Sequence, residues 1–158
     1  MRISNLSMAT THILVACGLL APSAFAVDQP NEGPCSNRTL SGAYGFSLQG
    51  ILFAIPGVTL PPGATVQLRG VVMTNFDGKG NFTQVDHVVI NGTPPALVWT
   101  PGYGTYTVNP NCTGSAVINI PGNPLAPVRV QFVVVKQGKE IYQVVDGNAV
   151  TSVGTRVE

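Results

Sequence analysis

From Leu40 to the end of the chain, short runs rich in Val, Ile, Thr, Phe and Tyr alternate with Gly, Pro, Asn and Asp. Runs of this kind, bounded by turn-forming residues, are typical of β-strands. No segment keeps a helical hydrophobic period through three turns. The pattern predicts an all-β domain whose main strands lie near residues 41–49, 66–75, 81–91, 103–109, 113–120, 128–136, 140–146 and 149–156.

Most connections between these strands are short turns. The segments Asp77–Gly80, Gln137–Lys139 and Asp146–Asn148 all contain glycine, which supplies the positive φ that tight hairpins need. Such short turns join antiparallel neighbours. The simplest arrangement is therefore an antiparallel eight-stranded up-and-down barrel, which leaves no open sheet edge. A two-sheet sandwich is the alternative, because periodicity does not separate the two.

Two connections are long, apolar and rich in proline: residues 50–64 and residues 92–102, the second of which contains Trp99. Ordinary surface loops are polar, so we expect something to cover these apolar side chains. They can fold over one mouth of the barrel, pack between subunits or line the entrance for a ligand.

The first 26 residues have the pattern of a signal peptide. Arg2 precedes a short apolar run at 13–20, and the stretch ends with small residues at Ala24 and Ala26. This run is shorter than the roughly 20 apolar residues that span a membrane. We expect cleavage after Ala26, leaving an N-terminal arm at 27–39 and a barrel domain at 40–158, without a membrane anchor. A lipoprotein signal acylated at Cys17 is a rival interpretation, but the residues before Cys17 are too polar for a full signal core.

The cysteines fit a secreted or periplasmic protein. Cys17 leaves with the signal, so only Cys35 and Cys112 remain, and two cysteines in an oxidising compartment most simply form one disulfide. Such a bridge would close a loop of about 77 residues and stabilise the fold by roughly 4 kcal/mol. Two free buried thiols are the alternative.

The charge balance is neutral. Without Arg2 the chain carries as many basic as acidic residues, seven of each. Nucleic acids and anionic membranes attract proteins with a basic surplus, so neither is expected as a partner. Charged residues make up 9% of the chain, against about 25% in average soluble domains. We therefore expect a surface of Thr, Ser, Asn, Gln and Gly, as suits an extracellular or periplasmic β protein.

Three stretches carry a family resemblance: Leu40–Phe46, Asn75–Phe82 and Gly104–Gly114. Together they resemble secreted bacterial proteins whose domain is described as allene-oxide-cyclase-barrel-like, close in shape to dirigent and lipocalin barrels. The resemblance implies an eight-stranded barrel with an apolar interior. It also implies a group that binds or reshapes hydrophobic small molecules and often forms homo-oligomers, in particular trimers.

The candidates for catalysis are His87, Glu140 and Tyr142. Asp86 and His87 are adjacent in the strand at 81–91, so their side chains point to opposite faces. Neither face is purely polar, so alternation does not tell which one looks inward. A His87 side chain that faces the lumen would serve as a general base. Glu140 and Tyr142 share one face of the strand at 140–146 and would hold a polar group of a ligand inside an apolar barrel. The alternatives are a surface histidine and a solvated Glu140 next to Lys139.

Aromatic residues are candidates for the wall of a ligand pocket or, equally, for a plain core. These residues are Tyr44, Phe46, Trp99, Tyr103 and Tyr106. A Cys/His zinc site lacks ligands once both cysteines are bridged. Asp77–Gly80 resembles a fragment of a calcium loop without the remaining carboxylates. We therefore expect no metal and no cofactor.

Three functions follow from these observations. The leading hypothesis is a secreted barrel that binds a hydrophobic small molecule in its lumen. The second is an enzyme of cyclase or isomerase type that acts on an apolar substrate through His87, Glu140 and Tyr142. The third is a structural or interaction protein with a filled barrel, whose apolar loops serve as contacts between subunits.

Overall fold

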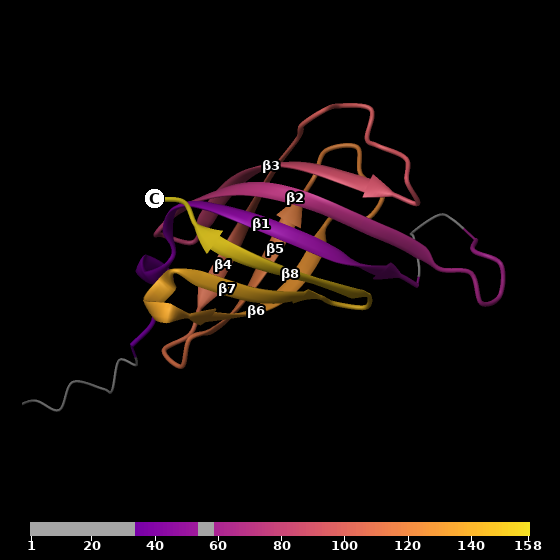
Figure 1. Ribbon diagram of the computed structural model, residues 1–158. Helices are drawn as coiled ribbons and strands as arrows, with labels where there is room; N and C mark the ends of the chain where they lie inside the picture. Colours follow the sequence, from indigo (N-terminus) through magenta and orange to yellow (C-terminus); the bar gives the residue numbers. More distant parts are fainter. Residues whose placement is uncertain (1–33, 54–58) are drawn as a thin grey trace, which may run out of the picture.

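The computed structural model describes residues 34–53 and 59–158, and these residues form a closed antiparallel barrel (Figure 1). Each strand pairs with the next in sequence, and β8 pairs with β1, so the sheet closes on itself. The strands are β1 (Ser41–Leu52), β2 (Val66–Asp77), β3 (Asn81–Ile90), β4 (Thr100–Val108), β5 (Thr113–Asn119), β6 (Val128–Val135), β7 (Glu140–Val145) and β8 (Ala149–Arg156). Two short 3₁₀ turns, η1 (Asn37–Thr39) and η2 (Lys136–Gly138), complete the fold.

The predicted eight-stranded barrel is confirmed, and the sandwich alternative is wrong. Two predicted boundaries shift by three residues, and the other strand ends agree to within two residues. β1 continues through Gly50 and Ile51 to Leu52, which pair with β2. β4 begins at Thr100, because this residue pairs with Asp86 of β3. The predicted signal peptide at 1–26 and the arm up to residue 33 lie outside the described residues. Within the described residues, no helix is long and apolar enough to cross a membrane.

Side chains alternate between the lumen and the outside along each strand. In β3, for example, Phe82, Gln84 and Asp86 are buried while Asn81 and Thr83 are exposed. Three phenylalanine rings in the lumen lie over glycines of a neighbouring strand, where a Cβ would come within 2.3 Å of the ring: Phe82 over Gly104, Phe132 over Gly114 and Phe46 over Gly154. These glycines give the rings the space that a narrow barrel otherwise lacks.

One end of the barrel, which we call the closed end, is plugged by a first cluster of buried residues that includes Leu40, Tyr44 and Tyr106. It carries η1, η2 and the C-terminus (Figure 1). The Tyr44 hydroxyl donates to the carbonyl of Gly138, and the Tyr106 hydroxyl donates to the carbonyl of Leu40 at 2.8 Å. The predicted disulfide between Cys35 and Cys112 is confirmed and ties the segment before η1 to the turn between β4 and β5. Covalent and hydrogen-bonded links therefore hold the plug in place.

The opposite end, which we call the open end, carries the long connections 91–99 and 120–127 and the turn between β7 and β8 (Figure 1). A second cluster of buried apolar residues lies toward this end, formed by Leu52, Val66, Leu68 and Val150. Leu60 of the connection between β1 and β2 and Leu125 of the connection 120–127 pack against it. The two clusters leave space between the barrel walls and the open-end loops, and that space holds the candidate site.

Candidate ligand-binding cavity

A cavity of about 740 Å³ occupies the lumen toward the open end. This volume lies within the range of roughly 300–1,000 Å³ typical of small-molecule sites. Most of its wall is apolar, with contributions from Phe46, Leu48, Leu68, Val72, Val88, Ile118, Val130, Val145 and Val150. Residues of the two long connections, among them Pro95, Leu97, Pro121 and Leu125, line its mouth. Side chains thus fill the closed half of the barrel, whereas the open half is hollow.

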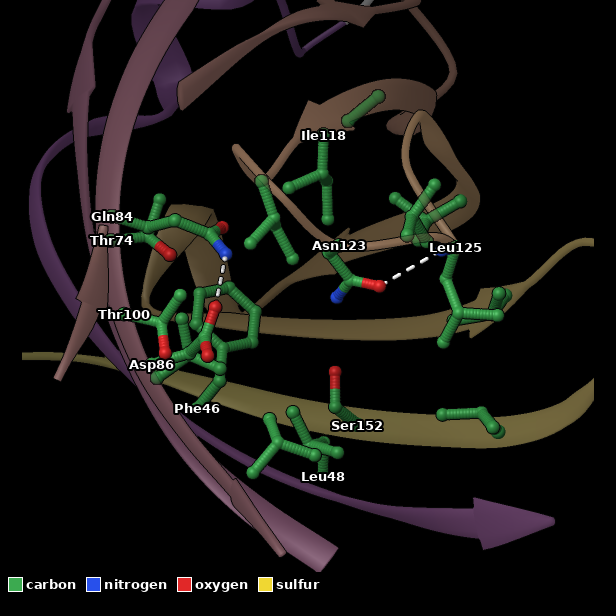
Figure 2. A pocket seen from close by; sticks show the side chains of 18 of the residues that line it. Phe46, Leu48, Thr74, Gln84, Asp86, Thr100, Ile118, Asn123, Leu125 and Ser152 are labelled. Atoms are coloured by element: carbon green, nitrogen blue, oxygen red, sulfur yellow. Dashed lines mark hydrogen bonds between the residues drawn. The ribbon is translucent and has the colours of Figure 1, made fainter. Parts of the chain in front are cut away.

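A group of polar side chains interrupts this apolar wall on β2, β3 and β4. Thr74, Gln84 and Asp86 are 4%, 8% and 5% exposed, respectively. The strand register pairs Thr74 with Gln84 and Asp86 with Thr100, and Figure 2 shows these side chains lying together on one side of the cavity. The Gln84 amide Nε2 donates to Asp86 Oδ2 at a long 3.4 Å.

Burial raises the pKa of the Asp86 carboxyl, while the hydrogen bond from Gln84 and the nearby His87 lower it to a smaller extent. Desolvation disfavours the charged form of any carboxyl that leaves water. The neutral form is therefore favoured over a wider pH range than in an exposed aspartate. A neutral carboxylic acid donates one hydrogen bond and also accepts, so Asp86 has both capacities inside the lumen.

The opposite wall contributes Ser152 of β8 and Gln143 of β7, which pair across the two strands. Ser152 is 6% exposed, and its Oγ has no hydrogen-bond partner among the described residues. In Figure 2 its hydroxyl points into the cavity, with Asn123 above it and Asp86 to its left. A buried hydroxyl without a partner is energetically unfavourable, so a polar ligand atom placed here would gain a hydrogen bond.

The mouth of the cavity carries the remaining polar groups. Asn123 accepts a hydrogen bond from the Leu125 amide at 2.8 Å and so shapes the connection between β5 and β6. Asn148 accepts one from the Phe53 amide at 3.1 Å. Among the described residues that line the cavity, Arg129 is the only basic one, and its side chain is exposed.

Of the aromatic residues predicted to form a pocket wall, Phe46 lines the cavity. Tyr44 and Tyr106 lie in the core of the closed end, at 0% and 3% exposure. Trp99 and Tyr103 are 52% and 56% exposed and do not line it. The pocket wall is therefore mainly aliphatic, and the tyrosines serve to plug the barrel or cover its outside.

His87 lies on the outer face of β3. Its Nδ1 is 2.7 Å from the carbonyl oxygen of Val98, and its ring packs edge-on against Trp99 at a centroid distance of 6.2 Å. A catalytic role for His87 was conditional on a side chain that faces the lumen, and Asp86 takes that orientation instead. His87 thus anchors the connection between β3 and β4 to the barrel wall.

Glu140 and Tyr142 also lie on the outer face, on β7. Glu140 forms an ion pair with Lys136, and the Tyr142 hydroxyl donates to Glu140 Oε2 at 3.1 Å. The hydrogen bond from Lys136 is the main cause that lowers the pKa of Glu140. These two residues do share a face, as expected, but their inward-facing neighbour Ile141 contributes to the lumen in their place.

Sequence reasoning missed the polar groups of the lumen, namely Thr74, Gln84, Asp86 and Ser152. The position of Phe82 in β3 could have indicated part of this group, because Phe82 shares its face with Gln84 and Asp86. The Phe82 ring lies over Gly104, where there is no side chain, and so occupies the inside of the barrel. In residues 34–53 and 59–158, no group of three or more His, Cys, Asp or Glu side chains is placed to hold a metal ion.

No protein-family model matches the chain, and comparisons with curated proteins and with solved structures found no significant match. The fold and the cavity themselves are therefore the grounds on which a function is inferred.

Proposed function

We propose that this protein binds an apolar small molecule in the lumen of its barrel. The observation that carries the proposal is the cavity of about 740 Å³ with mainly aliphatic walls, in a barrel plugged at its other end. A ligand that buries about 300 Å² of its own apolar surface would gain roughly 7.5 kcal/mol, at about 25 cal/mol per Å². Part of that gain is offset by the lost freedom of the ligand.

We further propose that binding takes place outside the cytoplasm. The disulfide between Cys35 and Cys112 is compatible with an extracellular or periplasmic location, because such bonds persist in oxidising compartments. The signal-peptide pattern of residues 1–26 supports the same location. The intact mass of the secreted protein under non-reducing conditions tests both: the expected species is the 27–158 chain with two hydrogens removed.

Titration with N-phenyl-1-naphthylamine, a neutral apolar dye that fluoresces on leaving water, tests the proposed binding. Two variants place the same bulky residue on different sides of the wall. Ile118→Trp fills the cavity, because Ile118 lines it, whereas Val85→Trp adds the ring on the outer face of β3, where Val85 is 37% exposed. We expect Ile118→Trp to weaken dye binding about tenfold or more and Val85→Trp to change it less than about twofold.

Equal binding by the wild type and Ile118→Trp would show that the dye lies elsewhere, for example in the shallow outer groove near Val133 and Val153. That result, or the failure of the wild type to bind the dye and a second neutral probe such as Nile red, would contradict the proposal. Circular dichroism of each variant separates a blocked cavity from a barrel that has not folded.

A further inference from the structure

The cavity contains more hydrogen-bonding capacity than its own walls use. We define the polar level of the lumen as Thr74, Gln84, Asp86 and Ser152, each less than a tenth exposed. These side chains come from β2, β3 and β8, line the cavity, and are seen around it in Figure 2. Burying polar groups within an apolar lumen is unfavourable unless they find partners.

The partners present are too few for this set. The Ser152 Oγ has none among the described residues, and the Asp86 carboxyl has one hydrogen bond with another side chain, the 3.4 Å contact from Gln84. Leaving a buried donor or acceptor unmatched is destabilising. Together, the Ser152 hydroxyl and the Asp86 carboxyl can donate to or accept from a third group that lies between them.

The charge of the lumen limits what that group can be. Within the described part of the chain, no basic side chain accompanies Asp86 at the polar level, and the basic residue of the lining, Arg129, is exposed at the mouth. A carboxylate that reached this level would be a second acidic group in a poorly solvated space, which is strongly unfavourable. An alkyl tail at this level would leave Ser152 and Asp86 without partners.

We propose that the ligand is an apolar molecule with a neutral oxygen function, a hydroxyl or a carbonyl, bound between Asp86 and Ser152, and that the site discriminates against carboxylate-headed lipids. This inference rests on the proposed binding function and names the chemical class of its ligand. The neutral oxygen supplies the missing partner for the polar level, and the aliphatic walls bury the rest of the molecule. The raised pKa of Asp86 also supports a neutral oxygen function at this place, since a neutral carboxylic acid can donate a hydrogen bond to the ligand.

Three ligands with the same alkyl chain test the head group: decanol, decanoic acid and decylamine, each used at pH 7 to displace N-phenyl-1-naphthylamine from the full-length protein. We expect decanol to displace the dye at a concentration about tenfold lower than decanoic acid does. The hydroxyl of decanol is a neutral partner for the polar level, whereas the carboxylate of decanoic acid brings a negative charge to it.

Variants connect this preference to the named residues. Asp86→Leu removes the hydrogen-bonding group and is expected to abolish the preference for decanol over decanoic acid. Asp86→Asn keeps a neutral group of the same shape and is expected to retain the preference. Ser152→Ala is expected to weaken decanol binding about threefold to tenfold. Its matched control is Ser47→Ala, on the exposed outer face of β1, which is expected to leave binding unchanged.

Each contrary outcome has a distinct meaning. Dye binding without discrimination between decanol and decanoic acid would overturn this inference and leave the proposed function standing. Tightest binding of decylamine would overturn it in favour of a charged anchor at Asp86. An unchanged preference for decanol in Asp86→Leu would also overturn it. A wild-type protein that binds neither the dye nor any of the three ligands would contradict the proposed function itself.

Discussion

Asp86 is a carboxyl buried in the lumen, and its position has a consequence for stability. Its folded-state pKa is raised by burial, so the folded protein holds this proton at pH values where the unfolded chain has released it. Stability therefore falls as pH rises from the unfolded pKa, near 4 for an aspartate, through the folded pKa. The buried carboxyl thus reduces stability at neutral pH, which agrees with the binding role that we propose for it.

Asp86→Asn is accordingly expected to raise the Tm at pH 7, with a gain that shrinks toward pH 4, where the wild-type carboxyl is increasingly protonated in both states. Thermal melts of both proteins at the two pH values measure this difference. Asp146→Asn makes the same change of charge at an exposed position and serves as the control. An equal gain in Tm at both pH values would indicate that the substitution changes packing and does not act by removing the desolvated carboxylate of Asp86.

Asp77 shows the opposite behaviour. Its Oδ1 accepts hydrogen bonds from the amides of Lys79 and Asn81 at 2.7 and 2.9 Å. The side-chain and backbone hydrogen bonds from Asn81 are the main causes that lower its pKa to about 2. A carboxyl with a lowered folded pKa stabilises the fold above its unfolded pKa, and this contribution is lost as pH falls through the folded one.

Asp77→Ala is therefore expected to lower the Tm by a few degrees at pH 7, with the difference from the wild type closing as the pH approaches 2. Asp77→Asn keeps an oxygen acceptor in the turn without the charge, so its Tm is expected to lie between the other two. Melting curves recorded across this pH range measure all three proteins. A difference that persists at pH 2 would assign the effect to turn geometry alone.

At the scale of the elements, the plug of the closed end depends on two tyrosine hydroxyls. The Tyr106 hydroxyl donates to the carbonyls of Leu40 at 2.8 Å and Asn37 at 3.0 Å, and so holds η1 and the start of β1 against β4. The aromatic ring packs edge-on against Phe76. These contacts fix how deep the lumen can extend toward the closed end.

Tyr106→Phe leaves buried carbonyls without their donor and is expected to lower the free energy of unfolding by about 1–3 kcal/mol. Tyr103→Phe also removes a tyrosine hydroxyl, from a side chain on the same strand that is 56% exposed. This control is expected to change the free energy of unfolding by less than about 0.5 kcal/mol. Urea denaturation of both variants provides the measurement. Equal effects would mean that the hydroxyl of Tyr106 is not what holds η1 in place.

The strands could be predicted from the sequence because their limits are set locally. Gly78, Gly138 and Gly147 adopt positive φ in the turns where glycine was expected to end a strand. The starts and ends that differ, at Thr100 and Leu52, depend on a partner strand, and a partner is not visible in a local pattern.

The candidate site was less predictable, because the two faces of β3 have similar polarity. His87 shares its face with Thr83 and Val85, whereas Asp86 shares its face with Gln84 and Val88, so alternation alone gives no direction. The direction is set by packing across strands, where the Phe82 ring occupies the space over Gly104 inside the barrel. A single sequence does not contain that information until the register is known.

At the scale of the whole molecule, the disulfide and the cavity lie at different ends of the barrel. It ties Cys35 to Cys112 at the closed end, with a sequence separation of 77, whereas the cavity lies toward the end that carries the long connections. Cross-linking a loop of this length restricts the unfolded chain. The bridge therefore acts on stability from the end of the barrel that lies away from the cavity.

Replacing both cysteines with alanine is expected to lower the free energy of unfolding by about 4 kcal/mol. Binding of N-phenyl-1-naphthylamine is expected to stay within about threefold at temperatures where the variant remains folded, because no disulfide atom lines the cavity. Urea denaturation and dye titration of the same preparation give both values. A loss of dye binding in a folded variant would show that the plug and the cavity are coupled.

The same bridge also determines how the barrel responds to tension. Cys35 and Cys112 enclose β1, β2, β3 and β4 in one covalent loop. A force applied between the N-terminal segment and the C-terminus passes directly from one cysteine to the other, so these four strands cannot be drawn out. Of the described strands, those after Cys112 can extend, starting with β8, which would peel from both β1 and β7 one hydrogen-bonded pair at a time. Under tension the protein can thus extend to a limited length. It reaches its full length only after the disulfide is reduced.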